Sequence, residues 1–135
     1  MIKLIIGAKG TGKTKSLIEL VNSAAGSSNG SVICIEKGDK LNYDVTYKAR
    51  LIDTKSFSVE DGHALYGFVA GIAASNHDIT HVFIDSALKI CSNDMDVFEE
   101  FVAAADKLSA AYKFDCIMTS SIPTDECPES LKKYL

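Results

Sequence analysis

Short apolar runs alternate along the chain with longer segments in which apolar residues recur every three or four positions. The short runs have the length of buried strands, and the longer segments have the spacing of helices that bury one face. The clear strands are predicted at residues 2–6, 31–35, 81–84 and 116–119. Strands that alternate with helices indicate βαβ units, so the pattern predicts an α/β fold with a mostly parallel sheet of about five strands.

Three helices are predicted between these strands. The first covers about residues 13–25 and ends at a stretch rich in glycine and serine. The second starts at Ser58, because Asp61 follows three residues later as in a capping box, and it ends near residues 75–76. The third is long and opens at residues 93–94, where Asn and Asp precede a new helical pattern.

Residues 41–53 have a mixed pattern. Tyr43, Val45 and Tyr47 alternate with polar residues, which fits a hairpin or an edge strand. We expect the two tyrosines to cover the sheet edge, and stacking on an adenine ring is the alternative.

Composition narrows the class of protein. At 135 residues the chain can form one domain, spanning residues 1–135, with a buried core. Its net charge of -4 argues against a broad nucleic-acid-binding face, and no apolar stretch is long enough for a bilayer. The N-terminus opens directly into a strand, so no signal peptide is expected. The four cysteines form no C-x-x-C pair, which predicts buried free thiols in a cytoplasmic protein.

The most specific motif reads G-x-x-x-x-G-K-T and lies between the first predicted strand and the first predicted helix. Its glycines let the backbone curl so that successive amides point inward, toward a β-phosphate at the positive end of the helix. Lys13 can reach the β- and γ-phosphates, and the Thr14 hydroxyl can ligate Mg²⁺. The predicted nucleotide-binding residues are Gly7, Ala8, Lys9, Gly10, Thr11, Gly12, Lys13, Thr14 and Lys15.

Two carboxylates follow predicted strands. Asp85 ends an apolar strand, where a phosphate-loop protein holds Mg²⁺, usually through water; capping a turn is the alternative role. Many ATPases with a phosphate loop have a glutamate directly after this aspartate, but here the residue is Ser86. Glu36 ends the strand after the phosphate-loop helix and is therefore the best candidate to position the attacking water, the alternative being a solvated side chain that opens a charged turn.

The strand ends at Glu36, at Asp85-Ser86 and at Thr119-Ser120 resemble those of RecA/KaiC/DnaB-type ATPases. The resemblance implies a three-layer α/β/α P-loop NTPase with a RecA-like strand order whose final strand is missing. It also implies a catalytic glutamate at Glu36 and a magnesium site at Asp85. Thr119 or Ser120 would sense the γ-phosphate. The whole chain also resembles small bacterial P-loop ATP-binding proteins, some of which carry the label of PilT-like twitching-motility ATPase.

A strand order of this kind places residues 116–119 between residues 2–6 and the strand that ends at Asp85. Residues 2–6 would then form an apolar edge strand, which is an aggregation hazard unless it is covered. We expect the edge to be covered by residues 128–135, which can form one or two helical turns, or by a second subunit.

The leading hypothesis is a protein that binds ATP and Mg²⁺, hydrolyses ATP slowly and acts as a nucleotide-dependent switch or assembly factor. The predicted catalytic residues are Lys13, Glu36, Thr119 and Ser120, and the predicted metal ligands are Thr14 and Asp85. Arg50 is the only arginine and is expected to be a solvated edge-strand residue. Without an arginine finger, turnover should be low.

Two other functions stay open. A small-molecule or nucleoside kinase fits the size of the chain, although no arginine-rich lid is present. A non-catalytic nucleotide-binding module is favoured mildly by Ser86 in place of glutamate. ATP is expected rather than GTP, because no N-K-x-D segment is present to read guanine. A homo-oligomer or an unidentified protein partner is left open, and nothing indicates a membrane or nucleic acid.

Overall fold

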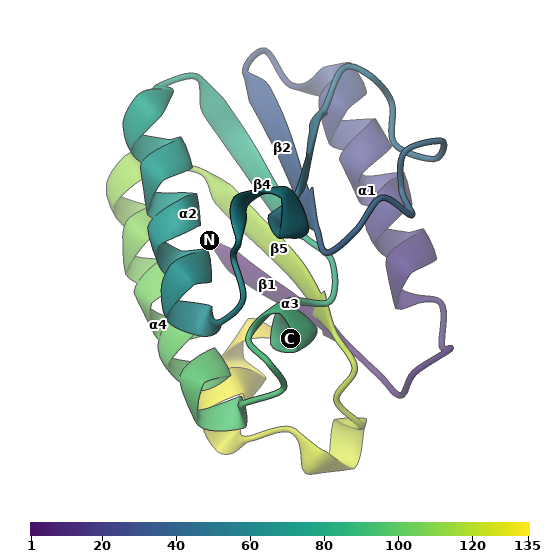
Figure 1. The fold of residues 1–135 in the computed structure, drawn as a ribbon, viewed down its shortest axis with the longest axis vertical. Coiled ribbons are helices and arrows are strands. Elements are labelled where there is room, and N and C mark those ends of the chain that lie inside the picture. The colour runs from purple at the N-terminus through teal and green to yellow at the C-terminus, as the bar shows by residue number, and fades with distance from the viewer.

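Five parallel strands form the central sheet of the protein (Figure 1). The structure is a computed structural model that describes residues 1–135. The strands are β1 (Ile2–Ile6), β2 (Ser31–Glu36), β3 (Arg50–Asp53), β4 (Ile79–Ile84) and β5 (Asp115–Ser120). Their order across the sheet is β1-β5-β4-β2-β3, and all four neighbouring pairs are parallel. The predicted α/β fold with a parallel sheet is therefore confirmed.

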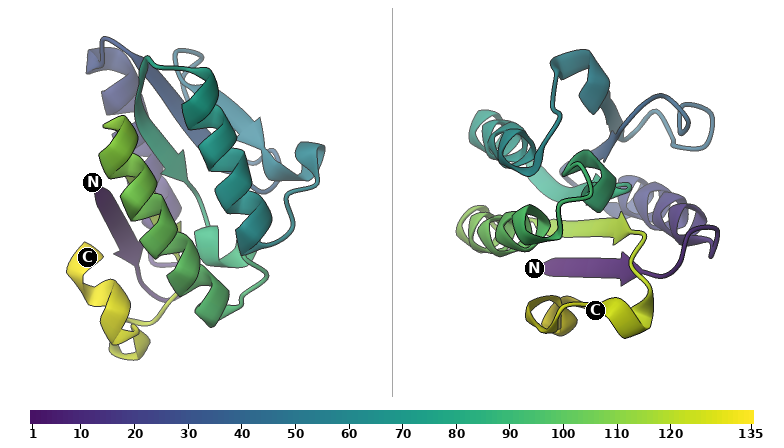
Figure 2. Two further views of the ribbon diagram at one scale, coloured as in Figure 1. Left: turned by 90° about the vertical axis from the view of Figure 1, so that its left-hand side faces the viewer. Right: turned by 60° about the horizontal axis from the view of Figure 1, so that its bottom comes forward.

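Helices cover both faces of this sheet and complete three layers (Figure 2). One face carries α1 (Lys13–Ser27), and the other carries α2 (Gly62–Ser75) and α4 (Met95–Tyr112). A single turn of helix, α3 (Ala87–Ile90), follows β4 and was not predicted. Short 3-10 segments occur at Thr54–Phe57, Thr124–Glu126 and Glu129–Tyr134. None of these helices combines the length and the apolar character needed to cross a membrane.

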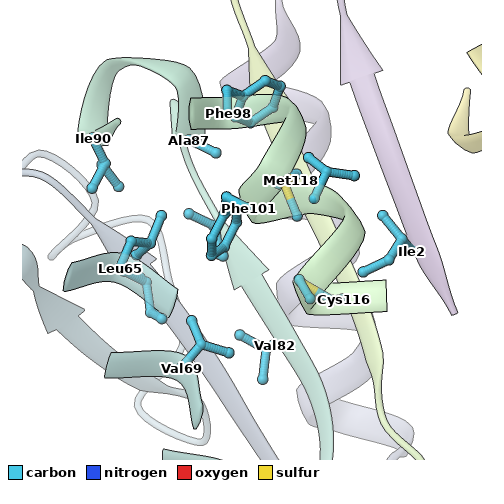
Figure 3. Close-up of a cluster of buried hydrophobic side chains, with 14 of the residues drawn as sticks. Ile2, Leu65, Val69, Val82, Ala87, Ile90, Phe98, Phe101, Cys116 and Met118 are labelled. Carbon is cyan, nitrogen blue, oxygen red and sulfur yellow. The ribbon is translucent and has the colours of Figure 1, made fainter. Parts of the chain in front are cut away.

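Alternation along the strands explains the two layers of core. On β2, Ile33 and Ile35 point to the side of α2 and α4, whereas Val32 and Cys34 point to the side of α1. The larger core lies under the two helices, and Figure 3 shows its centre, where side chains of α2, α3 and α4 meet those of β1, β4 and β5. All four cysteines are buried, as predicted.

The start of α2 differs from the sequence prediction. Asp61, not Ser58, caps this helix, because its carboxylate accepts a 2.8 Å hydrogen bond from the amide of Ala64. Ser58 instead ends the preceding 3-10 turn in the left-handed region, with φ of 56°. The long helix begins as predicted, since Asp94 accepts a 3.2 Å hydrogen bond from the amide of Val97.

The segment after β2 is largely a series of turns. Only Arg50–Asp53 is a strand, and it pairs in parallel with β2, so the edge strand is confirmed and the hairpin is wrong. Burial follows every fourth residue, at Leu41, Val45 and Ala49. Tyr43 and Tyr47 are 101% and 91% exposed. The expectation that they cover the sheet edge is therefore wrong: a turn with four-residue spacing, not a strand with alternation, sets which side chains are buried.

The β1 edge is covered by the C-terminal segment Glu129–Tyr134, on the side away from β5 (Figure 2). Leu131 is 1% exposed and belongs to the larger core. The Tyr134 hydroxyl donates a 2.9 Å hydrogen bond to Asp106, and Ser130 donates a 3.0 Å bond to Glu99, so both anchors are on α4. The predicted edge position of β1 and its cover by the chain's own C-terminal segment are confirmed.

Candidate functional site

The glycine-rich loop joins β1 to α1 at the carboxyl end of the sheet (Figure 1). Gly10 and Gly12 both have φ of 84°, a left-handed conformation that glycine adopts without steric cost. Gly12 is the N-cap of α1 and offers no side-chain cap. The first amides of α1 therefore lack a side-chain acceptor and carry the positive end of the helix dipole.

Two side chains of the loop fold back onto one carbonyl. Thr11 Oγ1 donates a 2.7 Å hydrogen bond to the oxygen of Ala8, and Lys13 Nζ donates a 2.9 Å bond to the same atom. A Cβ at position 7 would lie 2.7 Å from Thr11 Oγ1, so a side chain there would displace this hydroxyl from its contact. These contacts fix the shape of the loop and hold the Lys13 ammonium above it.

A hydroxyl, a carboxylate and a second hydroxyl meet beside this loop. Thr14 Oγ1 lies 3.1 Å and 3.4 Å from the two carboxylate oxygens of Asp85. Thr119 Oγ1 donates a 2.8 Å hydrogen bond to Asp85 Oδ1, and it accepts a 2.8 Å bond from the amide of Ser86. The contact arises because β4 and β5 are neighbours in register, with Ile84 opposite Met118. The structure thus brings together Thr14, Asp85 and Thr119, which lie far apart in the sequence.

Ser120 has a different position from Thr119. Its side chain is 1% exposed, donates a 2.7 Å hydrogen bond to the carbonyl of Thr119 and accepts a 3.3 Å bond from the amide of Leu88. Successive residues of a strand point to opposite faces. Ser120 therefore supports the start of α3, and only Thr119 of this pair faces the loop.

A cavity of about 500 Å³ opens above these groups. Its near wall is the loop and the first turn of α1, formed by Lys9, Gly10, Gly12, Lys13, Thr14 and Lys15. Its far wall comes from the segments after β2, β4 and β5, formed by Lys40, Ser86, Leu88, Lys89, Asn93, Thr119 and Ser121. Five of the lining residues are lysines and none is acidic. The cavity therefore concentrates positive charge on a protein whose net charge is -4.

Five residues of the far wall were missed by the sequence analysis, namely Lys40, Leu88, Lys89, Asn93 and Ser121. All five lie in the segments that come after strands, but none belongs to a motif. Their only signal in the sequence is their place shortly after strands that end at one edge of a parallel sheet.

Glu36 lies at the expected sheet edge but does not line the cavity. Its side chain is 3% exposed, and Oε2 accepts a 3.1 Å hydrogen bond from the amide of Leu41. Burial raises the pKa of this carboxyl above its usual range, the amides of Leu41 and Lys40 oppose that shift, and the nearby charges of Asp85 and Asp53 add to it. In this conformation the carboxylate closes the turn that follows β2.

The donor atoms beside the loop fit a magnesium ion. Thr14 and Asp85 supply hard oxygen atoms, which Mg²⁺ prefers, and Mg²⁺ commonly takes only one or two protein ligands together with phosphate and water oxygens. The chain has no group of three or more His, Cys, Asp or Glu side chains placed to hold a metal.

Arg50 does not reach the site. It is exposed and is the first residue of β3, whereas the loop lies at the opposite, carboxyl end of the parallel strands. Tyr43 and Tyr47 also do not line the cavity.

Comparison with protein-family models finds none that matches this chain, and comparison with curated proteins finds no significant match. The fold class is α/β, with a parallel sheet between helices.

Proposed function

We propose that this protein is a P-loop nucleotide-binding protein that binds Mg²⁺ and ATP and hydrolyses ATP slowly. One observation carries the proposal: Thr14 Oγ1 lies 3.1 Å from Asp85 Oδ1 beside a G-x-x-x-x-G-K-T loop, and Thr14 lines a cavity that has five lysines in its lining. A glycine loop that leads into a helix, followed by lysine and threonine, suits a polyphosphate. A carboxylate next to the threonine suits the metal that accompanies it.

The strand order supports a RecA-like nucleotide core that lacks its final strand. The strand of Thr119 separates the phosphate-loop strand from the strand of Asp85, and no strand lies beyond β1. This order, together with the resemblance of the strand ends, favours a small bacterial P-loop ATP-binding protein. The labels of motility proteins add nothing to the proposal, because the nucleotide loop alone does not specify motility.

Each residue then has a role. The amides from Gly10 to Thr14 bind phosphate oxygens, and Lys13 leaves the carbonyl of Ala8 to contact the β- and γ-phosphates. Thr14 and Asp85 hold the metal, and Thr119 orients Asp85. Bound Mg²⁺ would neutralise charge that develops on the phosphate oxygens.

Slow hydrolysis follows from the position of Glu36. Its carboxylate is engaged with the amide of Leu41, so it can orient a water for attack only after the turn at residues 37–41 has moved. The requirement suits a switch or an assembly factor, in which a partner could release the turn. The same contact is compatible with an alternative function, a nucleotide-binding module without hydrolysis, in which Glu36 only holds the turn.

Isothermal titration calorimetry with Mg²⁺ and a non-hydrolysable ATP analogue tests the proposal. The parent protein should bind, Lys13→Ala should lose binding, and Asp85→Asn should lose the dependence on Mg²⁺. Lys107→Ala is the matched control, because this lysine is exposed on α4 and does not line the cavity. Absence of binding by the parent would overturn the proposal.

Product analysis separates the remaining functions. Release of inorganic phosphate indicates hydrolysis, transfer to an added acceptor indicates a kinase, and retention of ATP indicates a binding module. ATP rather than GTP stays a prediction, which competition between the two nucleotides would check. Analytical ultracentrifugation with and without nucleotide would show whether the chain forms a homo-oligomer.

A further inference from the structure

The far wall of the cavity carries two lysines that the phosphate-loop motif does not include. Lys40 follows β2 and Lys89 lies in α3, after β4. Neither takes part in any of the three ion pairs of the protein, which involve other residues. Two unpaired cations thus face three lysines of the near wall across a cavity without a carboxylate in its lining.

Such an arrangement is unfavourable unless an anion enters. Like charges in a concave site repel one another, and a bound polyanion turns that repulsion into attraction. The near wall alone contributes Lys9, Lys13 and Lys15. Lys40 and Lys89 therefore suit a ligand that places additional negative charge next to the far wall, beyond the charge bound by the near wall.

Both lysines are presented by neighbours with fixed positions. Leu41, next to Lys40, is 3% exposed and donates its amide to Glu36. On either side of Lys89, Leu88 donates its amide to Ser120 and Ile90 is 1% exposed. The backbone at both lysines is therefore fixed beside the cavity by buried neighbouring residues.

The metal site indicates which part of the ligand they meet. Thr14 and Asp85 would hold a magnesium ion, which would neutralise charge on the phosphate groups at the end of a polyphosphate. Lys89 lies in the helical turn that comes directly after Asp85 and Ser86. Lys40 follows β2, the strand next to the one that ends before Asp85. The far wall therefore adjoins the position of the terminal phosphoryl group.

We infer that Lys40 and Lys89 bind the terminal phosphoryl group of a nucleoside triphosphate and so distinguish a triphosphate from a diphosphate. The inference rests on the proposed function and adds the cations of the second wall. In many ATPases and GTPases an arginine supplies this charge, often from another molecule. Here Arg50 lies away from the site, and two lysines of the same chain take that place.

Calorimetry with Mg-ATP and Mg-ADP tests the inference on the parent, Lys40→Ala, Lys89→Ala and the double variant. Charge-assisted hydrogen bonds contribute enough that each substitution should weaken ATP binding about tenfold, and ADP binding less than about twofold. Lys37→Ala and Lys107→Ala are controls, because both lysines are exposed and lie outside the lining. Circular dichroism should show that all variants are folded.

Inorganic tripolyphosphate is the second probe. It should compete with ATP on the parent and should lose affinity in the double variant to the same extent as ATP. Equal losses for ATP and ADP, unchanged ATP affinity in the double variant, or a loss for ATP without a loss for tripolyphosphate would each overturn the inference while the parent still binds nucleotide. Failure of the parent itself to bind would overturn the proposed function and the inference together.

Discussion

Thr119 Oγ1 donates a 2.8 Å hydrogen bond to Asp85 Oδ1, across two neighbouring strands. The same oxygen accepts a 2.8 Å bond from the amide of Ser86, the residue after Asp85. One buried hydroxyl therefore fixes both the carboxylate and the backbone at the end of β4. Because Thr14 Oγ1 also lies 3.1 Å from Asp85 Oδ1, the hydroxyl of Thr119 positions the carboxylate of the proposed metal site.

The variant Thr119→Val should show this dependence. It removes the donor to Asp85 and leaves the amide of Ser86 without its acceptor, so unfolding in urea should show a loss of about 1–3 kcal/mol. The Mg²⁺ concentration needed for nucleotide binding should rise. Thr119→Ser keeps the hydroxyl and is the control; if it lost as much metal dependence as the valine variant, the hydroxyl would not be the cause.

The variant Glu36→Gln should bind Mg-ATP as the parent does and lose hydrolysis. The amide oxygen of Gln can still accept from Leu41, so the turn stays closed, but the side chain cannot activate water. Phosphate release under saturating ATP is the measurement. Hydrolysis equal to that of the parent would show that Glu36 only holds the turn.

The same substitution should change how stability depends on pH. Burial raises the pKa of Glu36 above its ordinary value in the folded protein, whereas in the unfolded chain it is about 4.3. Between these two values the folded state holds the extra proton, so the stability from this group falls as pH rises through the window. Glu36→Gln removes this loss, because its side chain carries no charge.

Thermal unfolding of the parent and of Glu36→Gln across pH 4 to 8 measures the effect. The variant should be the more stable protein at neutral pH, and the difference should shrink as the pH falls toward the unfolded value. A difference that grew on acidification would mean that the folded-state pKa of this carboxyl is lowered rather than raised.

The hydroxyl of Thr54 offers a test of stability away from the site. This residue is 0% exposed, and its Oγ1 has no hydrogen-bond partner. An unpaired buried hydroxyl is unfavourable, so Thr54→Val, which replaces it with a methyl group of similar shape, should raise the free energy of unfolding by about 1–2 kcal/mol. Urea denaturation measures it. Thr54→Ser keeps the hydroxyl, loses a methyl group and should be less stable than the parent.

The near wall of the site could be predicted from the sequence, whereas on the far wall only Thr119 was a predicted site residue. A strand, a glycine loop and a helix place Lys13 and Thr14 by local geometry alone, and a strand that ends in Asp85 brings a carboxylate to the same edge of a parallel sheet. The positions of Lys40 and Lys89 depend on the paths of two short segments, the turn after β2 and the single helical turn α3. The four residues of α3 are too few to show a helical period, so the sequence pattern does not predict the helix that carries Lys89.

The prediction of a hairpin within residues 41–53 was wrong for a similar reason, because contacts between distant residues decide the local structure. Tyr43, Val45 and Tyr47 alternate with polar residues, which suggested a strand, but Leu41, Val45 and Ala49 are the residues that pack inward. Both spacings exist in the same stretch, and Asn22 of α1 selects the second, because it bonds the carbonyl of Asp44 and the amide of Thr46 at 2.9 Å each. Such a contact between distant residues is not visible in a local pattern.

The C-terminal turns have a consequence for how the sheet could be extended. With Leu131 in the core beside β1, an incoming strand at that side would have to expel a buried leucine and break the Tyr134–Asp106 bond before pairing could start. The other side ends at β3, whose four residues are all that is open to a new backbone ladder. Growth of the sheet by strand addition is therefore restricted to the short β3 edge, and β1 is shielded from it.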